Sequence, residues 1–333
     1  MSMNWKDWEG KKILITGVTG LVGSWLVKAL LKRKSIIVVL VRDIDYQTEF
    51  YRSGDYLQTN IVNGSLENFS LIERAINEYE IDTVFHLGAQ TIVGAAYREP
   101  LQTFESNIRG TYHILEACRR HREFVKEIVI ASSDKAYGIA DKLPYTEDMP
   151  LKGSHPYDVS KSCTDLLAQT YSYTYNMPIA IARCGNIYGG GDLNWSRIIP
   201  GTILSLLNNK RPVIRSNGKY IRDYIYVKDI VDAYINLAES ITKKNISGEA
   251  FNFSTESRMA VIEIVNKIRS IMSKEDLEPQ ILNLNLKEIP EQSLSAKKAH
   301  EILGWYSKYN LEKGLSETVD WYKNYFNKKC TNR

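Results

Sequence analysis

Tyr157 and Lys161 are the two residues whose types and spacing point most directly to chemistry. They lie four positions apart in the run SHPYDVSK, so on a helix over residues 156–175 their side chains would be neighbours. A phenol with an ordinary pKa of about 10 needs a nearby cation to lose its proton near neutral pH. Lys161 would be that cation, lowering the pKa of Tyr157 so that the phenol acts as a general base.

A second group of reactive side chains comes from Ser133, Asp134 and Lys135, which follow an apolar, β-branched run. They place a hydroxyl, a carboxyl and an amine just past a predicted strand, where parallel sheets bind ligands. Ser133 and Asp134 therefore argue against a chance surface pairing of Tyr157 with Lys161. For Lys135, a solvated lysine or a nucleotide contact stays an open alternative to proton transfer.

The N-terminal part carries a glycine-rich turn. An apolar strand over residues 12–16 runs into GVTGLVG and then into a helix with an apolar face. Strand, glycine turn and helix in this order open a dinucleotide-binding unit. Because the backbone must turn tightly and approach a pyrophosphate, we expect Gly17, Gly20 and Gly23 to hold the phosphates of the dinucleotide.

The next predicted strand, over residues 36–41, is followed by Arg42 and Asp43. An acid about 20 residues after the last glycine accepts hydrogen bonds from the adenosine ribose of NAD. An arginine there can instead hold the extra phosphate of NADP. We expect NAD, with NADP as the alternative.

Strands and helices alternate over the first 180 or so residues, which predicts an α/β fold with a doubly wound parallel sheet of the Rossmann type. The expected strands cover residues 12–16, 36–41, 56–62, 82–87, 127–131 and 179–183. The expected helices cover residues 66–79, 101–120 and 156–175.

After residue 185 the pattern changes to shorter elements. We expect a strand in YIRDYIYV and helices near 198–208, 229–239, 295–303 and 311–325. This predicts two domains: a dinucleotide-binding domain over 1–185, and a smaller C-terminal α/β lobe over 186–333 that binds substrate and is interleaved with the last strands of the sheet.

Composition excludes several classes of protein. The net charge of +4 is small for 333 residues and the basic residues are scattered, so we expect no nucleic-acid partner. The polar N-terminus and the absence of a long apolar run predict no signal peptide and no membrane span. Four cysteines without metal-ligand spacing predict reduced thiols in a cytoplasmic protein and no metal site. We expect His86 and His155 to be structural histidines.

The motifs TGVTGLVG, HLGAQ, SNIRGT, SSDKAYG, YDVSK and RCGNIYGGGD occur in this order over nearly the whole chain. In this combination the chain resembles the extended short-chain dehydrogenase/reductase family of nucleotide-sugar epimerases and dehydratases. Within that family, GSWL, SDK before a tyrosine and GNIYGGGD look most like CDP-glucose 4,6-dehydratases.

The resemblance implies roles for residues that match the family's motifs. The implied contacts to NAD come from Gly17, Thr19, Gly20, Leu21, Val22, Gly23, Arg42, Asp43, Leu87, Ala89, Gln90, Asn107, Tyr157 and Lys161. The implied contacts to the sugar diphosphate come from Asn186, Arg222 and Arg197. The resemblance also implies a homodimer formed through the helices over 101–120 and 156–175.

In such dehydratases a hydride passes from sugar carbon 4 to NAD while the tyrosine takes the hydroxyl proton, and the hydride later returns to carbon 6. The resemblance assigns the first proton to Tyr157, assisted by Ser133 and Lys161. We expect Asp134 to be the acid that protonates the departing 6-hydroxyl. Lys135 would be the base at carbon 5, which requires a neutral amine.

Two other functions stay open. A nucleotide-sugar 4-epimerase would share Ser133, Tyr157, Lys161 and NAD, but would have no use for the acid and base of Asp134 and Lys135. A non-catalytic nucleotide-binding regulator could use the same fold. Such proteins typically lose the tyrosine or the lysine, and this chain keeps both.

Overall fold

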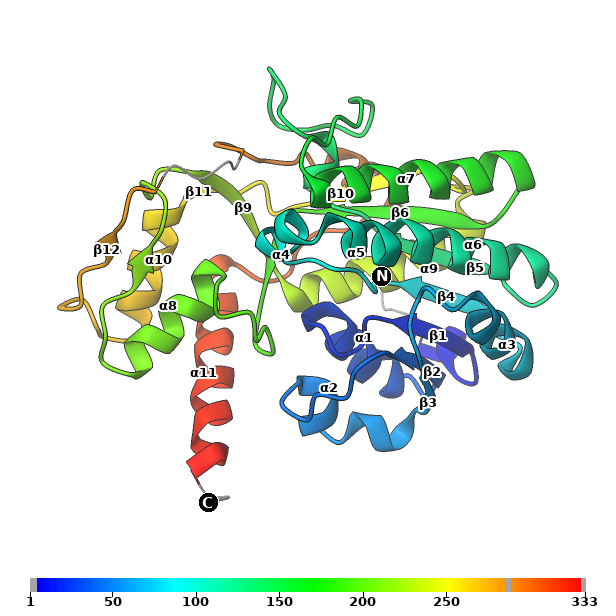
Figure 1. Cartoon of the computed structure of the whole chain (residues 1–333), viewed down its shortest axis with the longest axis horizontal. Helices are drawn as coiled ribbons and strands as arrows, with labels where there is room; N and C mark the ends of the chain where they lie inside the picture. The colour runs from blue at the N-terminus through cyan, green and yellow to red at the C-terminus, as the bar shows by residue number, and fades with distance from the viewer. Residues whose placement is uncertain (1–4, 285–288, 331–333) are drawn as a thin grey trace.

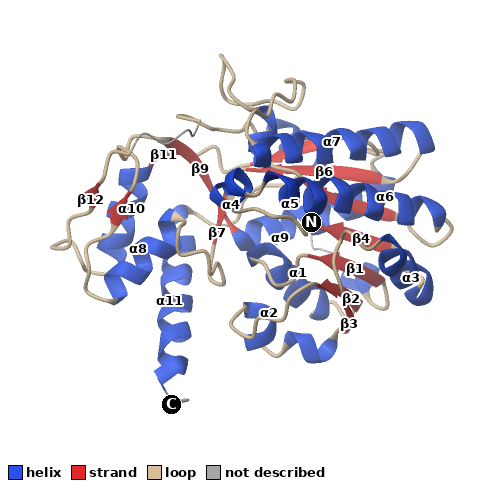
Figure 2. Cartoon of the chain, viewed as in Figure 1, coloured by secondary structure: helices blue, strands red, loops and turns tan. Residues whose placement is uncertain are grey.

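The centre of the molecule is a seven-stranded sheet whose neighbouring strands are all parallel (Figures 1 and 2). A computed structural model describes residues 5–284 and 289–330 of the chain. The strands follow the order β3-β2-β1-β4-β5-β6-β10. Their bounds are β1 Lys12–Thr16, β2 Ile36–Val41, β3 Asn60–Asn63, β4 Thr83–His86, β5 Glu127–Ala131, β6 Ile179–Cys184 and β10 Ala250–Phe253. The order reverses between β1 and β4, which creates the crevice where such sheets bind ligands.

Helices cover both faces of this sheet and make a three-layer molecule (Figure 1). One face is covered by α1 (Leu21–Leu31) and α9 (Val227–Lys243). The other face is covered by α3 (Phe69–Tyr79), α6 (Gly110–Arg120) and α7 (Pro156–Tyr175). The predicted doubly wound α/β fold is confirmed.

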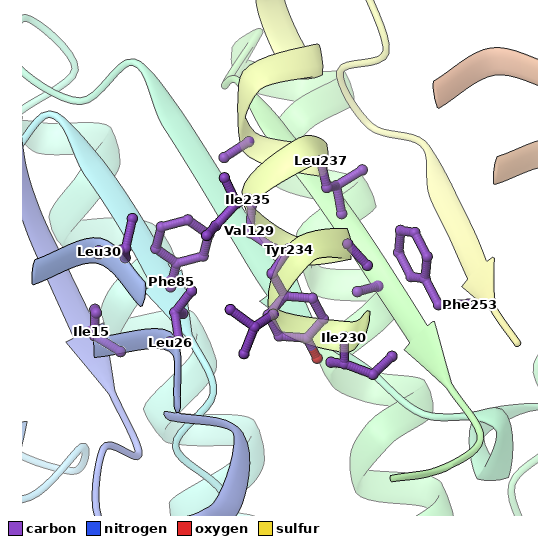
Figure 3. Close-up of a cluster of buried hydrophobic side chains, with 14 of the residues drawn as sticks. Ile15, Leu26, Leu30, Phe85, Val129, Ile230, Tyr234, Ile235, Leu237 and Phe253 are labelled. Atoms are coloured by element: carbon purple, nitrogen blue, oxygen red, sulfur yellow. The ribbon is translucent and has the colours of Figure 1, made fainter. Parts of the chain in front are cut away.

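The core follows from the alternation of side chains along each strand. On β1, Ile13 and Ile15 point to the α1/α9 side, whereas Leu14 points to the α3/α6/α7 side. On β4, Phe85 points to the α1/α9 side and Val84 points to the α3/α6/α7 side. Figure 3 shows the first of these clusters, in which Phe85 lies among side chains of α1 and α9. Because both faces are buried, the strands are apolar on both sides.

A smaller group of elements forms a second lobe beside the sheet (Figure 2). It contains a three-stranded sheet in the order β11-β9-β7 and a two-stranded sheet of β12 and β8. The strands are β7 Asn186–Tyr188, β8 Val213–Ile214, β9 Ile221–Tyr226, β11 Arg258–Ala260 and β12 Gln280–Ile281. The helices are α8 Ile198–Leu207, α10 Val261–Ile271 and α11 Leu311–Cys330. Across the described ranges, no helix combines the length and the apolarity that a bilayer span requires.

Several elements differ from the sequence-based expectation. The strand expected over 56–62 is wrong at its start, because residues Asp55–Gln58 form a 3-10 turn (η2) after the left-handed Gly54. The helix expected from residue 66 begins at Phe69, because the Asn68 side chain caps it by accepting a hydrogen bond from the Leu71 amide. The helix expected over 295–303 is mainly a π-turn at Ala299–Leu303 (η5).

The helix expected over 101–120 is also interrupted. It consists of α5 (Pro100–Phe104), a π-turn at Glu105–Arg109 (η3) and α6. A π-turn adds one residue and rotates the helix face that follows it. On α6, which follows this π-turn, Tyr112 is 36% exposed, while Leu115 is buried.

Candidate active site

The glycine turn lies at the centre of the carboxyl edge of the sheet, between β1 and α1. Gly17 has φ +77°, and a Cβ there would lie 2.8 Å from the Gly88 backbone nitrogen. A Cβ on Gly23 would lie 2.2 Å from the Gly17 carbonyl oxygen. Only glycine fits either position, so the backbone can make the tight turn in front of α1, which is called the cradle below.

The start of α1 suits an anion. Its first turn contains no acidic residue, and the helix begins at Leu21 directly after Gly20, which makes no side-chain cap. The first amides of a helix have no intrahelical acceptor and carry partial positive charge. A pyrophosphate in this cradle would meet the turn that contains Thr19, Leu21 and Val22.

Arg42 and Asp43 follow β2 at the same edge. The Arg42 Nε donates to the Asp43 carboxylate over 2.6 Å, and both side chains are exposed. An exposed carboxylate remains able to accept hydrogen bonds from ribose hydroxyls. The ion pair holds the Arg42 cation beside that carboxylate. The two side chains implied for the adenosine ribose therefore lie side by side at the end of β2.

The end of β4 forms the second wall of this crevice. Thr16 Oγ1 accepts hydrogen bonds from the Leu87 amide at 3.1 Å and the Gly88 amide at 2.9 Å. His86 lies between Thr16 and Thr111 at 2.9 and 3.1 Å, and burial lowers its pKa to about 3. His86 is therefore a neutral core histidine, as predicted.

Asn107 joins three elements at the π-turn. Its Oδ1 accepts from the Gln90 amide at 2.7 Å, and its Nδ2 donates to the Ser160 hydroxyl of α7 at 2.9 Å. Nδ2 also lies 3.1 Å from the Gln90 carbonyl oxygen, and the side chain is 1% exposed. Asn107 therefore fixes the loop from Ala89 to Gln90 against α7, which carries Tyr157.

Ser133 starts the catalytic loop after β5. Its hydroxyl donates to Asp134 Oδ1 at 3.0 Å and accepts from the Lys135 amide at 3.2 Å, so it caps the 3-10 turn Asp134–Tyr137 (η4). The Tyr157 phenol lies near enough to Ser133 for the hydroxyl to act on its pKa. The Ser133 hydroxyl thus lies beside Asp134, Lys135 and Tyr157, all three of which were chosen from the sequence.

Tyr157 and Lys161 are buried on the first turns of α7. Burial raises the pKa of Tyr157 to about 12, and the Arg197 cation is the largest influence that lowers it. We expected Lys161 to lower the pKa of Tyr157, and the structure differs because the cost of burying a phenolate is larger than the effect of nearby cations. Lys161 Nζ instead donates to the Ala131 carbonyl oxygen at 2.6 Å, and burial lowers its pKa to about 8.

Asp134 is 4% exposed, and burial raises the pKa of its carboxyl, an effect that the Lys135 cation partly opposes. The Lys135 ammonium reaches the other way and donates to Gln292 Oε1 at 3.0 Å. An acid with a raised pKa beside an amine is an arrangement suited to paired proton transfers.

The three predicted substrate residues lie on the second lobe. Asn186 on β7 pairs in register with Tyr224 on β9. Arg222, also on β9, donates to the carbonyl oxygens of Ile221 and Pro290 and acts electrostatically on Asp134. Arg222 is therefore close to the catalytic loop.

Arg197 approaches the site from the start of α8. It donates to Asp192 at 2.9 Å and lies 3.4 Å from the Thr91 hydroxyl. Its effect on the pKa of Tyr157 places its charge near the phenol. The resemblance implied only a diphosphate contact for Arg197, whereas in the structure its charge also acts on Tyr157.

Two polar residues near the site were missed by sequence reasoning. Asp223 is 1% exposed, and burial raises the pKa of its carboxyl to about 6. Asp223 follows Arg222 directly in the motif IRDYIYV, so the motif that indicated Arg222 could also have indicated Asp223. Gln292 carries no motif and lies 157 residues from Lys135, so no local pattern could reveal it.

Comparisons with known proteins agree with this geometry. A sequence model of the family described as GDP-mannose 4,6 dehydratase matches residues 14–318. CDP-glucose 4,6-dehydratase of Salmonella typhimurium is 30% identical over 332 residues, covering 95% of this chain and 91% of that protein. dTDP-D-glucose 4,6-dehydratase of Dictyostelium discoideum is 31% identical over 276 residues, covering 78% of this chain and 62% of that protein.

Solved structures share the fold. UDP-glucose 4-epimerase of Thermotoga maritima, solved with UDP-glucose, has a TM-score of 0.85 at 26% identity, covering 95% of this chain and 99% of that one. dTDP-glucose 4,6-dehydratase of Bacillus anthracis, solved with NAD, has a TM-score of 0.83 at 25% identity, covering 95% and 97%. The chain therefore belongs to the GDP-mannose 4,6-dehydratase family, a family of NAD-dependent nucleotide-sugar dehydratases within the short-chain dehydrogenase/reductases.

Proposed function

We propose that this protein is a nucleotide-diphosphate-sugar 4,6-dehydratase that makes a 4-keto-6-deoxy sugar, with a CDP-glucose-like substrate favoured. The observation that carries the proposal is the placement of Asp134 and Lys135 next to Ser133 and Tyr157. Oxidation at carbon 4 needs only the tyrosine, whereas loss of water from carbons 5 and 6 needs a further acid and a further base. The similarity to the Salmonella CDP-glucose 4,6-dehydratase supports the choice of nucleotide.

The cofactor of this reaction is NAD. The turn that contains Gly17 and Gly23 suits a pyrophosphate, because a Cβ at either position would clash with backbone and prevent the tight turn that leads into the start of α1. We assign the remaining contacts to the residues at the same edge of the sheet, which are Thr19, Gly20, Leu21, Val22, Arg42, Asp43, Leu87, Ala89, Gln90, Asn107, Tyr157 and Lys161. When bound, NAD accepts a hydride from carbon 4 and its reduced form returns a hydride to carbon 6.

The side chains move the protons. Once positive charge added beside it has ionised the phenol, Tyr157 takes the proton of the 4-hydroxyl, and Ser133 lies beside the phenol to hydrogen-bond that hydroxyl. The resulting 4-ketone acidifies the hydrogen on carbon 5. Lys135, in the neutral form that this step requires, removes that hydrogen as a proton, the electron pair forms the bond between carbons 5 and 6, and Asp134 protonates the 6-hydroxyl, which leaves as water. Burial raises the pKa of Asp134, which favours the protonated carboxyl that this step needs. When carbon 6 receives the hydride, Lys135 returns a proton to carbon 5.

The second lobe would hold the nucleotide sugar. We assign it to residues 186–333, apart from α9 and β10, which pack in the main sheet. Arg222 and Arg197 supply cations for the diphosphate, since a guanidinium matches phosphate oxygens in charge and shape. Asn186 would add a hydrogen bond from β7.

We also infer a homodimer of a cytoplasmic enzyme. The faces of α5 and α7 that point away from the sheet expose Leu101 at 71% and Leu166 at 53%, and these two helices pack together. Large exposed apolar side chains on adjacent helices favour contact with a second copy. Cys118 and Cys184 are buried, and neither forms a disulfide within the described part of the chain.

A 4-epimerase is the second candidate, because the Thermotoga structure has the same fold over nearly the whole of both chains. An epimerase exchanges no hydrogen at carbon 5. The Lys135→Ala variant, incubated with CDP-glucose in heavy water, distinguishes the two functions. We expect deuterium incorporation at carbon 5 to fall by about 10²- to 10⁴-fold, while formation of bound NADH stays near the wild-type rate.

Lys142→Ala is the matched control, because Lys142 is an exposed lysine of the loop that follows η4. It should exchange carbon 5 like the wild type. Wild-type rates of exchange in Lys135→Ala would show that another group is the base. Wild-type protein that makes NADH but exchanges nothing at carbon 5 would favour the epimerase.

A further inference from the structure

The segment Pro290–Ser295 ties the catalytic side of the molecule to the second lobe. The Gln292 amide donates to the Ile221 carbonyl oxygen of β9 at 3.1 Å, and the Ile221 amide donates to the Pro290 carbonyl oxygen at 3.0 Å. One residue further on, the Ser293 carbonyl oxygen accepts from the Tyr145 amide at 2.8 Å. The backbone of Gln292 is therefore held between β9 and the loop that follows η4.

The Gln292 side chain extends from this fixed backbone to Lys135. Its Oε1 accepts the hydrogen bond from Lys135 Nζ at 3.0 Å, and the side chain is 1% exposed. Because the lysine nitrogen donates, the amide has to present its oxygen and turn its Nε2 away. That Nε2 is buried and has no hydrogen-bond partner among the residues that the structure describes.

A glutamine that served folding alone would be expected to pair both ends of its buried amide. Gln292 instead pairs only its amide oxygen, and the partner is Lys135, the residue that we propose removes the carbon 5 proton. A lysine side chain has four rotatable bonds and no preferred direction of its own. A rigidly held acceptor would limit Nζ to one position, which is how positioning groups raise rates.

We propose that Gln292 is a positioning residue that holds the Lys135 amine for removal of the carbon 5 proton. This role rests on the proposed dehydratase function. Its neutral amide orients the nitrogen in either charge state, whereas a carboxylate would favour the ammonium. The other charged groups near Lys135 are the carboxyls Asp134 and Asp158, with Arg222 next to Asp134 and His155 next to Asp158.

The test uses the full-length protein and five nucleotide sugars: CDP-glucose, UDP-N-acetylglucosamine, dTDP-glucose, GDP-mannose and a GDP-heptose. The variants are assayed with whichever of these the wild type dehydrates, beginning with CDP-glucose. Gln292→Met keeps a similar side-chain volume and removes the acceptor. We expect carbon 5 exchange and kcat to fall about 10- to 100-fold, with KM and the formation of NADH nearly unchanged. Ser293→Ala is the matched control, because it alters the next buried residue, whose hydroxyl has no partner among the described residues.

Gln292→Glu is the second variant, and it covers the case in which Gln292→Met does not fold. It keeps an acceptor but adds a charge that stabilises the ammonium, so the pH profile of exchange should move about one unit toward alkaline pH. A profile and rate equal to those of the wild type would overturn the role.

The remaining outcomes distinguish failure of the positioning role of Gln292 from failure of the proposed dehydratase function. Wild-type exchange in Gln292→Met would overturn the positioning role and leave the dehydratase intact. Equal loss of NADH formation and exchange would assign Gln292 to folding or to substrate binding instead. Wild-type protein that loses no water from any of the five sugars would overturn both the role and the proposed function.

Discussion

Burial acts in opposite directions on the two titratable groups of α7. It raises the pKa of Tyr157 to about 12 and lowers that of Lys161 to about 8, because in both cases it disfavours the charged form. The phenol is therefore protonated near neutral pH in this arrangement, and its ionisation requires added positive charge. The spacing of Tyr157 and Lys161 predicted their places on one helix, but not their burial, which comes from the sheet beneath α7.

Asp223 offers a direct test of this effect of burial. Its pKa in the folded protein is about 6, above the ordinary value of 3.8, chiefly because the carboxylate is buried. Above pH 6 both folded and unfolded chains carry the charge, so the cost of burial is fully present. As the pH falls from 6 toward 4, the folded state binds a proton first and the cost is relieved.

Asp223→Asn removes the charge and keeps an oxygen that can accept from the Ser254 hydroxyl and the Leu294 amide. We expect the variant to be more stable than the wild type by about 2–3 kcal/mol at pH 7.5, with the gain shrinking to about 1 kcal/mol at pH 4.5 and toward zero only below pH 3.8. Urea unfolding of the wild type and of Asp223→Asn at the two pH values measures this difference in the free energy of unfolding. The exposed Asp276→Asn should change stability at neither pH, and a gain in Asp223→Asn that did not depend on pH would contradict the explanation.

At the scale of elements, the strands of the sheet and the long helix α7 were easier to predict than interruptions within helices. The strands over 12–16, 36–41 and 127–131 and the helix over 156–175 occur as expected. The π-turn at Glu105–Arg109 had no signal in the hydrophobic period, because Asn107 and Ser106 are buried polar residues in a run that reads as ordinary helix. Tertiary hydrogen bonds from Asn107 to Gln90 and Ser160 accompany the extra residue.

The exposed face of α7 carries the prediction of a dimer. Leu166 is 53% exposed on this helix, and a charge there would be buried on association. We expect the wild type to sediment at twice 38.1 kDa and Leu166→Arg to sediment as a monomer. Leu57→Arg, which changes an even more exposed leucine on η2, should remain a dimer. A wild-type monomer, or a dimer that survives Leu166→Arg, would exclude this face.

At the scale of the whole molecule, the site lies where the two lobes meet. The catalytic loop after β5 faces β9 and the segment Pro290–Ser295, which are distant in sequence (Figure 1). Motifs predicted the glycine turn, the tyrosine and the lysine, because each motif is short and local: the glycine turn joins β1 to α1, and Tyr157 and Lys161 lie four residues apart on α7. Gln292 and Asp223 could not be assigned roles in this way, since their importance comes from contacts made only after the lobes pack.

The measurement that tests the central claim most directly is mass spectrometry of the products. The purified protein is incubated with CDP-glucose, UDP-N-acetylglucosamine, dTDP-glucose, GDP-mannose and a GDP-heptose. We predict that CDP-glucose is converted to a product lighter by one water, because Asp134 and Lys135 supply the acid and base that elimination requires. A product of unchanged mass but altered retention would contradict the dehydratase and make the protein an epimerase, and five unchanged sugars would favour a non-catalytic nucleotide-binding protein.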